Sequence, residues 1–240
     1  MATNEQHAEP DVSALFYALA QDLKVPLTSI AYKAEVAQFT KSHDFAADIE
    51  YTARTMLDVI EAYILSIQSD RQMALGLEPV NPSAVVADVA ESLQELAKKF
   101  ACEVRTDLQH VPHYALTNRR ALALALSTVG RVFIEAQDVV DSKNKAIVIS
   151  SYKTAQGGIR VGVFGEGMHE LVTSDLLSRA RSYVGTAARP FSALAAGVSS
   201  HLFVAERLAS AIDAPMHSAK HSNLSGLAFD LTQTAQLSLV

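Results

Sequence analysis

Apolar residues recur at steps of three and four along the first third of the chain, a spacing typical of helices with one buried face. The first such stretch predicts one long helix over residues 12–40. Pro26 lies inside this pattern and should bend the helix, because proline removes a backbone donor and crowds the preceding turn. Its apolar positions are Leu15, Leu19, Leu23, Leu27, Ile30, Ala34 and Ala37.

A polar break over residues 41–44 separates this stretch from a second helical stripe that ends near Ser69. Each helix would be about 40 Å long at a rise of about 1.5 Å per residue. An isolated antiparallel hairpin of this length leaves a wide apolar stripe uncovered, so we expect it to pair with a second copy into a four-helix bundle. The alternative is that the stripe packs against the rest of its own chain. Its apolar positions are Ile49, Ala53, Met56, Leu57, Ile60, Tyr63, Ile64 and Ile67.

After residue 76 the pattern of hydrophobic and polar residues predicts both strands and helices, rather than helices alone. Asn81 and Pro82 predict a helix start, and two β-branched runs around a Gly-Gly turn predict a hairpin. The predicted helices cover residues 83–100, 118–137, 176–183 and 197–212, and the predicted strands cover 102–108, 146–152, 159–164, 215–219 and 226–231.

This order predicts an α+β protein, in which the helical hairpin precedes an α/β sandwich with helices on one face. We expect a disordered tail over residues 1–11, the hairpin over 12–75, a linker over 76–82 and the second domain over 83–240.

Composition narrows the functional classes. The chain has 240 residues, of which 49% are hydrophobic, and a net charge of −6. This charge argues against a general nucleic-acid surface, and the single Cys102 argues against an internal disulfide or a zinc cluster. The sequence has no apolar run of roughly 20 residues and no leader-like start, which predicts a cytoplasmic protein without a membrane segment.

Residues 20–30 read Ala-Gln-Asp-Leu-Lys-Val-Pro-Leu-Thr-Ser-Ile. This segment resembles the phosphoacceptor box of sensor histidine kinases, His-Glu-Leu-Arg-Thr-Pro-Leu-Thr-x-Ile, with Pro26 and Thr28 in their family positions. Gln21 occupies the slot of the accepting histidine, and a carboxamide offers no nucleophilic ring nitrogen. The resemblance implies that Asp22, in the slot of the acidic residue that orients this histidine, has nothing to activate. We therefore expect Asp22 to be a solvated helix residue.

The resemblance extends to the nucleotide-binding boxes of the GHKL-type ATPase domain. Residues 128–133 match the box whose last asparagine holds Mg²⁺, but Val132 stands in that slot and offers no oxygen ligand. Residues 163–168 match the Asp-x-Gly-x-Gly box that contacts adenine. Val163 replaces its aspartate, while Gly165 and Gly167 are kept, which predicts that the turn after the strand is preserved.

The fourth box of the family, Gly-x-Gly-Leu-Gly-Leu, cradles phosphates at the start of a helix. The matching segment begins at Gly197 and lacks the other two glycines, because Ser199 and His201 stand in their places. Side chains there hinder close approach of the backbone to a ligand, although a helix N-terminus still attracts an anion. Taken with the other boxes, this implies that ATP and Mg²⁺ binding are lost, and we expect no cofactor and no metal.

The sequence contains eight histidines, each of which is a candidate for a substitute acceptor or a metal ligand. His110 and His113 have no third ligand nearby in the sequence, so surface histidines are the better interpretation. Ser200 and His201 are adjacent, but no Gly-x-Ser-x-Gly motif supports a hydrolase. The remaining histidines, which fit no motif, are His7, His43, His169, His217 and His221.

The resemblance implies a degenerate, non-catalytic histidine-kinase-like signalling protein. It would act as a dimeric adaptor for a response-regulator receiver domain or a partner kinase. Two alternatives remain open: an atypical active histidine kinase or phosphotransferase with non-standard nucleotide contacts, and a structural module unrelated to kinases.

Overall fold

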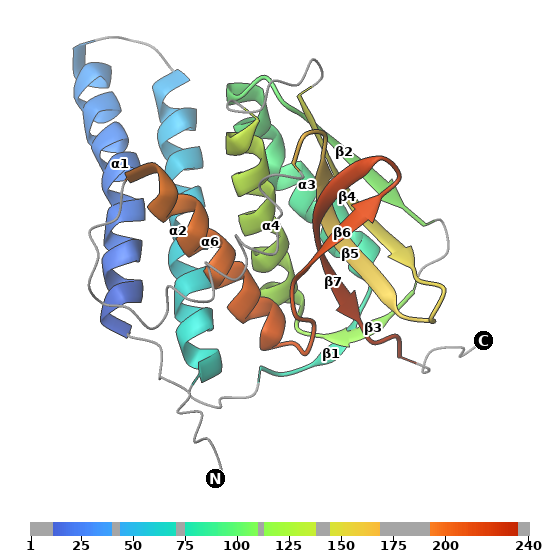
Figure 1. The fold of residues 1–240 in the computed structure, drawn as a ribbon. Helices are drawn as coiled ribbons and strands as arrows, with labels where there is room; N and C mark the ends of the chain where they lie inside the picture. Colours follow the sequence, from blue (N-terminus) through green and yellow to red (C-terminus); the bar gives the residue numbers. More distant parts are fainter. Residues whose placement is uncertain are drawn as a thin grey trace.

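The computed structural model describes residues 12–39, 44–70, 75–109, 113–137, 145–168 and 193–234 (Figure 1). The predicted tail over 1–11 and the predicted short helix over 176–183 lie outside these residues. The described part contains a helical hairpin beside a domain of helices and sheet, which confirms the predicted α+β class.

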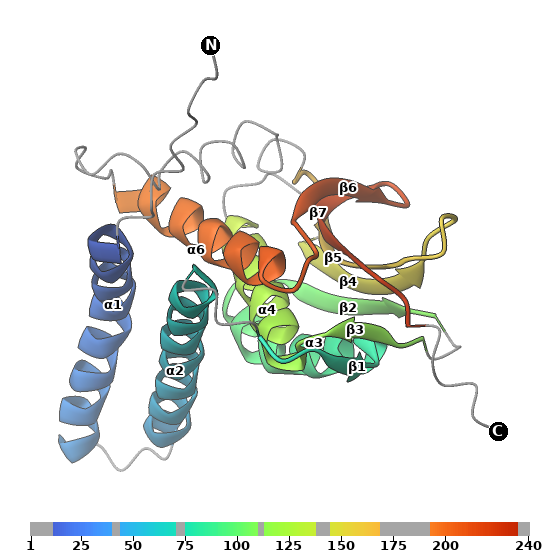
Figure 2. The ribbon, with the colours of Figure 1, turned by 90° about the horizontal axis from the view of Figure 1, so that it is seen from below.

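The hairpin consists of α1 (Val12–Phe39) and α2 (Asp44–Asp70), which lie side by side (Figures 1 and 2). Both helices were predicted with nearly these bounds. Pro26 lies within α1, which continues past it to Phe39. Among the described residues, no helix combines the length and apolar character needed to cross a membrane.

The domain is built on a five-stranded sheet in the order β2-β4-β5-β7-β6. Strands β4, β5, β7 and β6 pair antiparallel with their neighbours, whereas β2 pairs parallel with β4. A parallel pair needs a long crossover, which α4 and the residues around it supply here. The strands are β2 (Glu103–Leu108), β4 (Ala146–Lys153), β5 (Ile159–Gly165), β6 (His217–His221) and β7 (Leu224–Leu231).

Helices α3 (Pro82–Lys99) and α4 (Arg119–Ala136) pack against one face of this sheet. Each starts at an asparagine cap: the Asn81 side chain accepts a hydrogen bond from the Ser83 amide, and Asn118 accepts one from the Ala121 amide. Such caps satisfy amides that the first helical turn leaves unpaired. Helix α6 (Ala193–Ser210) packs on α4 and reaches α2 (Figure 2).

A small two-stranded ribbon was not predicted. Strands β1 (Glu78–Val80) and β3 (Ala115–Thr117) pair antiparallel, so the expected linker over 76–82 contains a strand. Three-residue strands are too short to show an alternating pattern, and their partner lies far along the chain. Periodicity therefore could not reveal them.

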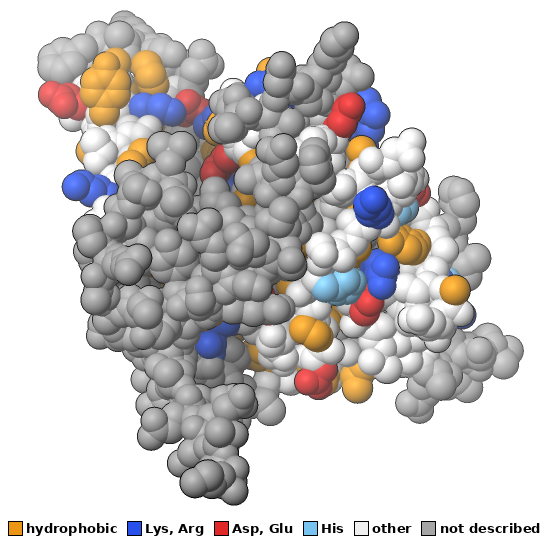
Figure 3. Space-filling view, in the orientation of Figure 1, with side chains coloured by type: hydrophobic (Ala, Val, Ile, Leu, Met, Phe, Trp, Pro, Cys, Tyr) orange, Lys and Arg blue, Asp and Glu red, His pale blue; other side chains and the backbone are white. Residues whose placement is uncertain are grey.

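The outer face of the sheet, away from α3 and α4, is strongly coiled. His221 on one edge strand packs its ring on Tyr152 and Phe164, and its Nε2 lies 2.8 Å from Asp107 Oδ2 on the opposite edge strand. Phe164 is fully buried on this face. On the sheet side of the molecule, the described acidic and basic side chains are interspersed rather than separated by sign (Figure 3).

The hairpin packs against its own domain through α2. Met56, Ala62, Tyr63 and Ser66 are buried where α2 meets α4 and α6. Part of the apolar stripe on α2 is thus covered by the rest of the same chain, which is the alternative to pairing with a second copy. Leu57 and Ile64 of the same helix remain 64% and 47% exposed.

Candidate functional site

The acceptor-like segment, from Gln21 to Thr28, lies in the third to fifth turns of α1, which begins at Val12. Gln21 is exposed, and Asp22 is half-buried. Pro26 has no amide hydrogen, so the Asp22 carbonyl has no helical donor from that position. One turn along, Thr28 Oγ1 donates to the Lys24 carbonyl at 2.8 Å. The exposed group at the acceptor position is therefore a carboxamide.

Asp22 is held by two side chains from other helices. The Tyr63 hydroxyl of α2 donates to Asp22 Oδ2 at 2.7 Å, and His201 Nε2 of α6 lies 3.2 Å from the same oxygen. Tyr63 is 1% exposed, and the Asp22 and His201 side chains are each 14% exposed. The expectation of a solvated Asp22 was wrong, because α6 folds back onto α1, a contact between distant segments that no local pattern reveals.

The His201 contact is an ion pair rather than an aligned hydrogen bond. Nε2 lies within ion-pair distance of Asp22, but it has no hydrogen-bond partner of acceptable geometry in the described structure. The contact therefore places an imidazole beside the carboxylate without an aligned hydrogen bond.

Further charged groups surround this pair. Burial raises the pKa of Glu135 on α4, and Asp22 adds to this rise, while His201 and Arg131 oppose it. Burial also lowers the pKa of Arg207 on α6, whose Nε donates to the Ser66 carbonyl at 3.2 Å. The junction of α1, α2, α4 and α6 is thus a partly buried polar cluster.

The residues predicted to have lost nucleotide contacts lie in the core of the domain. Val132 is 2% exposed on α4, and Val163 is fully buried on β5, in register with Ile149 and Leu227. Isopropyl groups supply neither a metal ligand nor a hydrogen-bond acceptor for adenine. That ATP and Mg²⁺ do not bind here stays a prediction.

Gly165, the last residue of β5, and Gly167, in the turn that follows, occupy positions that favour glycine. Gly167 has a φ of +72°, and a turn follows the strand as predicted. A Cβ at Gly165 would lie 2.9 Å from Met168 Cγ and 3.3 Å from the amide nitrogen of Gln137. The turn after β5 therefore depends on these two glycines.

Gln137, at the end of α4, was missed by sequence reasoning. Its side chain is fully buried beside Gly165, and neither its amide oxygen nor its nitrogen has a hydrogen-bond partner among the described residues. An unsatisfied buried carboxamide is costly. The sequence carries no clear signal for it, because Gln137 is one of several polar residues in and beside the amphipathic helix α4.

The segment that resembles the phosphate cradle is helical. Helix α6 begins at Ala193 rather than at Gly197, where the sequence predicted it to start. Amides beyond the first turn of a helix bond to carbonyls four residues earlier. The amides from Gly197 onward are therefore used inside α6, which corrects the expectation that they lie at a helix N-terminus open to an anion.

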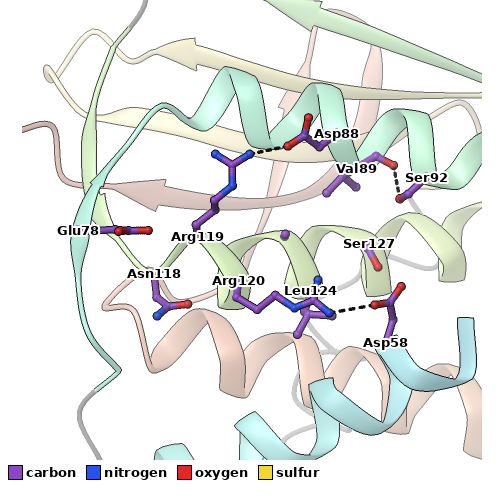
Figure 4. A pocket seen from close by; sticks show the side chains of 11 residues that line it. Asp58, Glu78, Asp88, Val89, Ser92, Asn118, Arg119, Arg120, Leu124 and Ser127 are labelled. Carbon is purple, nitrogen blue, oxygen red and sulfur yellow. Dashed lines mark hydrogen bonds and ion pairs between the residues drawn. The ribbon is translucent and has the colours of Figure 1, made fainter. Parts of the chain in front are cut away.

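A cavity of about 450 Å³ lies on the other side of α4, between α2, α3 and β1 (Figure 4). Its floor includes Val89 and Leu124. Arg119 bonds Asp88 of α3 at 2.6 Å, and Arg120 pairs with Asp58 and Glu61 of α2. Because both guanidinium groups already have carboxylate partners, this cavity is poorly suited to bind phosphate.

Comparison with known proteins identifies similar folds. No protein-family profile matches the chain. The sensor protein NisK of nisin biosynthesis, from Lactococcus lactis subsp. lactis, is 25% identical over 158 residues, which cover 62% of this chain and 33% of NisK. The chain thus corresponds to about a third of that relative.

Two solved structures resemble the chain over most of its length. The histidine kinase AdeS of Acinetobacter baumannii superposes with a TM-score of 0.52 at 17% identity, over 89% of this chain and 98% of AdeS. Full-length ShkA in complex with AMPPNP superposes with a TM-score of 0.54 at 14% identity, over 95% of this chain and 47% of ShkA.

Proposed function

Because the chain has the fold of a histidine kinase catalytic core, a helical hairpin followed by an ATPase-type domain, we propose that it is a non-catalytic signalling protein of this type. It acts in the cytoplasm as a dimeric adaptor for a response-regulator receiver domain or a partner kinase. The observation that carries the proposal is the exposed Gln21 at the acceptor position of a hairpin that otherwise keeps the fold.

The donor side supports the same proposal. Val132 and Val163 are buried apolar side chains at the slots of the metal ligand and the adenine contact. The amides from Gly197 onward are used within α6. Acceptor, metal slot, adenine slot and phosphate cradle thus each lack the group that phosphoryl transfer from ATP requires.

The surface of α1 supports an adaptor role. Val25 is 75% exposed and Tyr32 is 66% exposed, and Phe16 and Leu27 are also largely exposed. At about 3.6 residues per turn, Phe16 and Leu27 lie on one side of α1, and Val25 and Tyr32 lie on the opposite side. Exposed apolar side chains on both sides of a helix leave room for more than one interaction partner. A second copy of the hairpin would cover part of this surface, and a receiver domain or partner kinase would use the remainder.

The decisive experiment compares the wild-type chain with Gln21→His. We expect neither protein to label itself with radiolabelled Mg-ATP, because Gln21→His restores the acceptor but not the donor site. A partner histidine kinase supplied in trans is expected to label only Gln21→His. Acid-labile, base-stable self-labelling of the wild-type chain would contradict the proposal, and self-labelling of Gln21→His alone would show that ATP still binds.

One observation favours the alternative of a phosphotransferase. His201 lies 3.2 Å from Asp22, so an imidazole does stand beside the carboxylate of the acceptor-like segment, although it comes from α6. A carboxylate beside a histidine is a common arrangement for activating a nucleophile. In the same assay with acetyl phosphate as donor, labelling that His201→Gln removes and His217→Gln leaves intact would favour this alternative over an adaptor.

A further inference from the structure

We propose that Asp22, Tyr63 and His201 form a latch that holds the α/β domain in one orientation on the helical hairpin. The three residues come from α1, α2 and α6, and they meet at a single carboxylate oxygen. The inference rests on this geometry and does not depend on the proposed signalling function.

The latch connects helices of the two parts of the molecule. Tyr63 joins α2 to α1 through its hydrogen bond to Asp22, and His201 joins α6 to α1. Beside them, Arg207 joins α6 to α2 through the Ser66 carbonyl. Helix α6 crosses the ends of α1, α2 and α4 and packs on all three (Figure 2), so its position on the hairpin helps to set the orientation of the domain.

The other ion pairs between hairpin and domain are more exposed. Toward the hairpin turn, Lys99 Nζ of α3 lies 3.4 Å from Asp48 Oδ1, with side chains 41% and 43% exposed. Arg120 of α4, which pairs with Asp58 and Glu61, is 51% exposed. Exposed pairs of this kind contribute about 0–1 kcal/mol each, so after loss of the latch the orientation of the hairpin depends mainly on the packing of α2 against α4 and α6.

The latch fixes orientation more than it adds stability. A buried ion pair roughly balances its own desolvation cost, but removing one partner leaves the other charge buried and unpaired. Interfaces between domains that are rich in polar contacts permit relative motion. Loss of one latch residue is therefore expected to move the hairpin relative to the domain without unfolding either part.

Further charged groups lie beside the latch. Glu135 of α4 interacts electrostatically with both His201 and Asp22, and Glu206 and Arg207 follow His201 on its own helix. The latch is therefore part of a larger polar cluster at the junction of the two parts.

Distance measurements between two spin labels test the proposal. In a Cys102→Ser background, Lys24→Cys on α1 and Lys153→Cys on β4 provide exposed labelling positions on the two parts. The parent protein is expected to show one narrow distance distribution. Asp22→Asn, His201→Gln and Tyr63→Phe are each expected to add a second, displaced component.

Two controls make the outcome decisive. Arg119→Gln breaks an ion pair inside the domain and should leave the distribution unchanged. The exchange Asp22→His with His201→Asp restores a carboxylate–imidazole pair and should return the single narrow distance. The proposal is overturned if the latch variants keep the parent distribution while retaining its circular dichroism spectrum.

Discussion

At the scale of single residues, Glu135 shows how the junction cluster affects stability. Burial raises the pKa of this carboxyl group, with Asp22 acting in the same direction and His201 and Arg131 against it. A carboxyl group with a higher pKa in the folded than in the unfolded state binds protons more tightly when folded. Ionisation of Glu135 therefore lowers the stability of the folded state as the pH rises above the pKa that this group has in the unfolded chain.

Replacing Glu135 by Gln should therefore stabilise the protein at pH 7.5, by about 0.5–1 kcal/mol. The gain should vanish near about pH 4, where the carboxyl group is largely protonated in both states. Urea unfolding at the two pH values measures the difference. Glu91→Gln, on the exposed side of α3, should change neither value. A loss of stability in Glu135→Gln at pH 7.5 would mean that attraction by His201 and Arg131 outweighs the cost of burial.

At the scale of secondary structure elements, the pairing of β5 with β7 depends on a missing side chain. Gly226 lies opposite Phe164 in the ladder. A Cβ at Gly226 would lie 2.1 Å from the Val163 carbonyl oxygen and 2.6 Å from Phe164 Cδ1. This close approach allows Phe164 to fill the coiled outer face, where His221 packs on it.

The variant Gly226→Ala is expected to lower the free energy of unfolding by about 3 kcal/mol or more, because the new methyl group meets backbone that has no room to move. Gly76→Ala is the matched control, since a Cβ there has nothing within 4 Å, and it should stay within about 0.5 kcal/mol of the parent. Thermal unfolding followed by circular dichroism compares the two. Equal melting temperatures would show that β7 can shift away from β5.

The elements also show where sequence reasoning succeeds and fails. Helices α1 to α4 and strands β4 and β5 were predicted within a few residues, because each carries its own periodicity or cap. The β1–β3 ribbon and the parallel partner of β4 were not predicted, because strand pairing is set by contacts between distant segments and leaves no local sequence pattern. Of the candidate site, the sequence could point only to contiguous motifs such as that around Gln21, whose role stays a prediction. The contacts of Asp22 with Tyr63 and His201 and the buried Gln137 depend on tertiary packing.

At the scale of the whole molecule, the hairpin is only partly covered. Its inner side packs on α4 and α6, while Leu57 and Ile64 of α2 remain exposed at a spacing of two helical turns. A helix that is apolar on more than one side requires more than one packing partner. A second hairpin would provide this partner and close a four-helix core.

The variant Leu57→Glu tests this assembly, because Leu57 is exposed in the single chain and a charge there should cost the monomer little. We expect the parent to be a dimer at concentrations of about tens of micromolar, and Leu57→Glu to be a folded monomer, since burial of an unpaired carboxylate at an interface costs several kcal/mol. Leu77→Glu, at an exposed leucine outside the hairpin, should stay dimeric. Light scattering after gel filtration reports the masses, and a monomeric parent would contradict the prediction.

The order of strands in the sheet has a consequence for the way the protein folds. The β4–β5 and β6–β7 pairs join strands that are close in sequence, whereas the central β5–β7 pair joins Gly165 to Ser225. Local hairpins form within about 1–10 μs, but pairing of distant segments must first overcome the entropy of closing a long loop. The docking of two preformed hairpins along β5 and β7 should therefore be the slow step of folding. Because the closure cost grows only by about 0.6 kcal/mol for each doubling of loop length, lengthening the connection between β5 and β7 outside α6 and β6 should slow this step little.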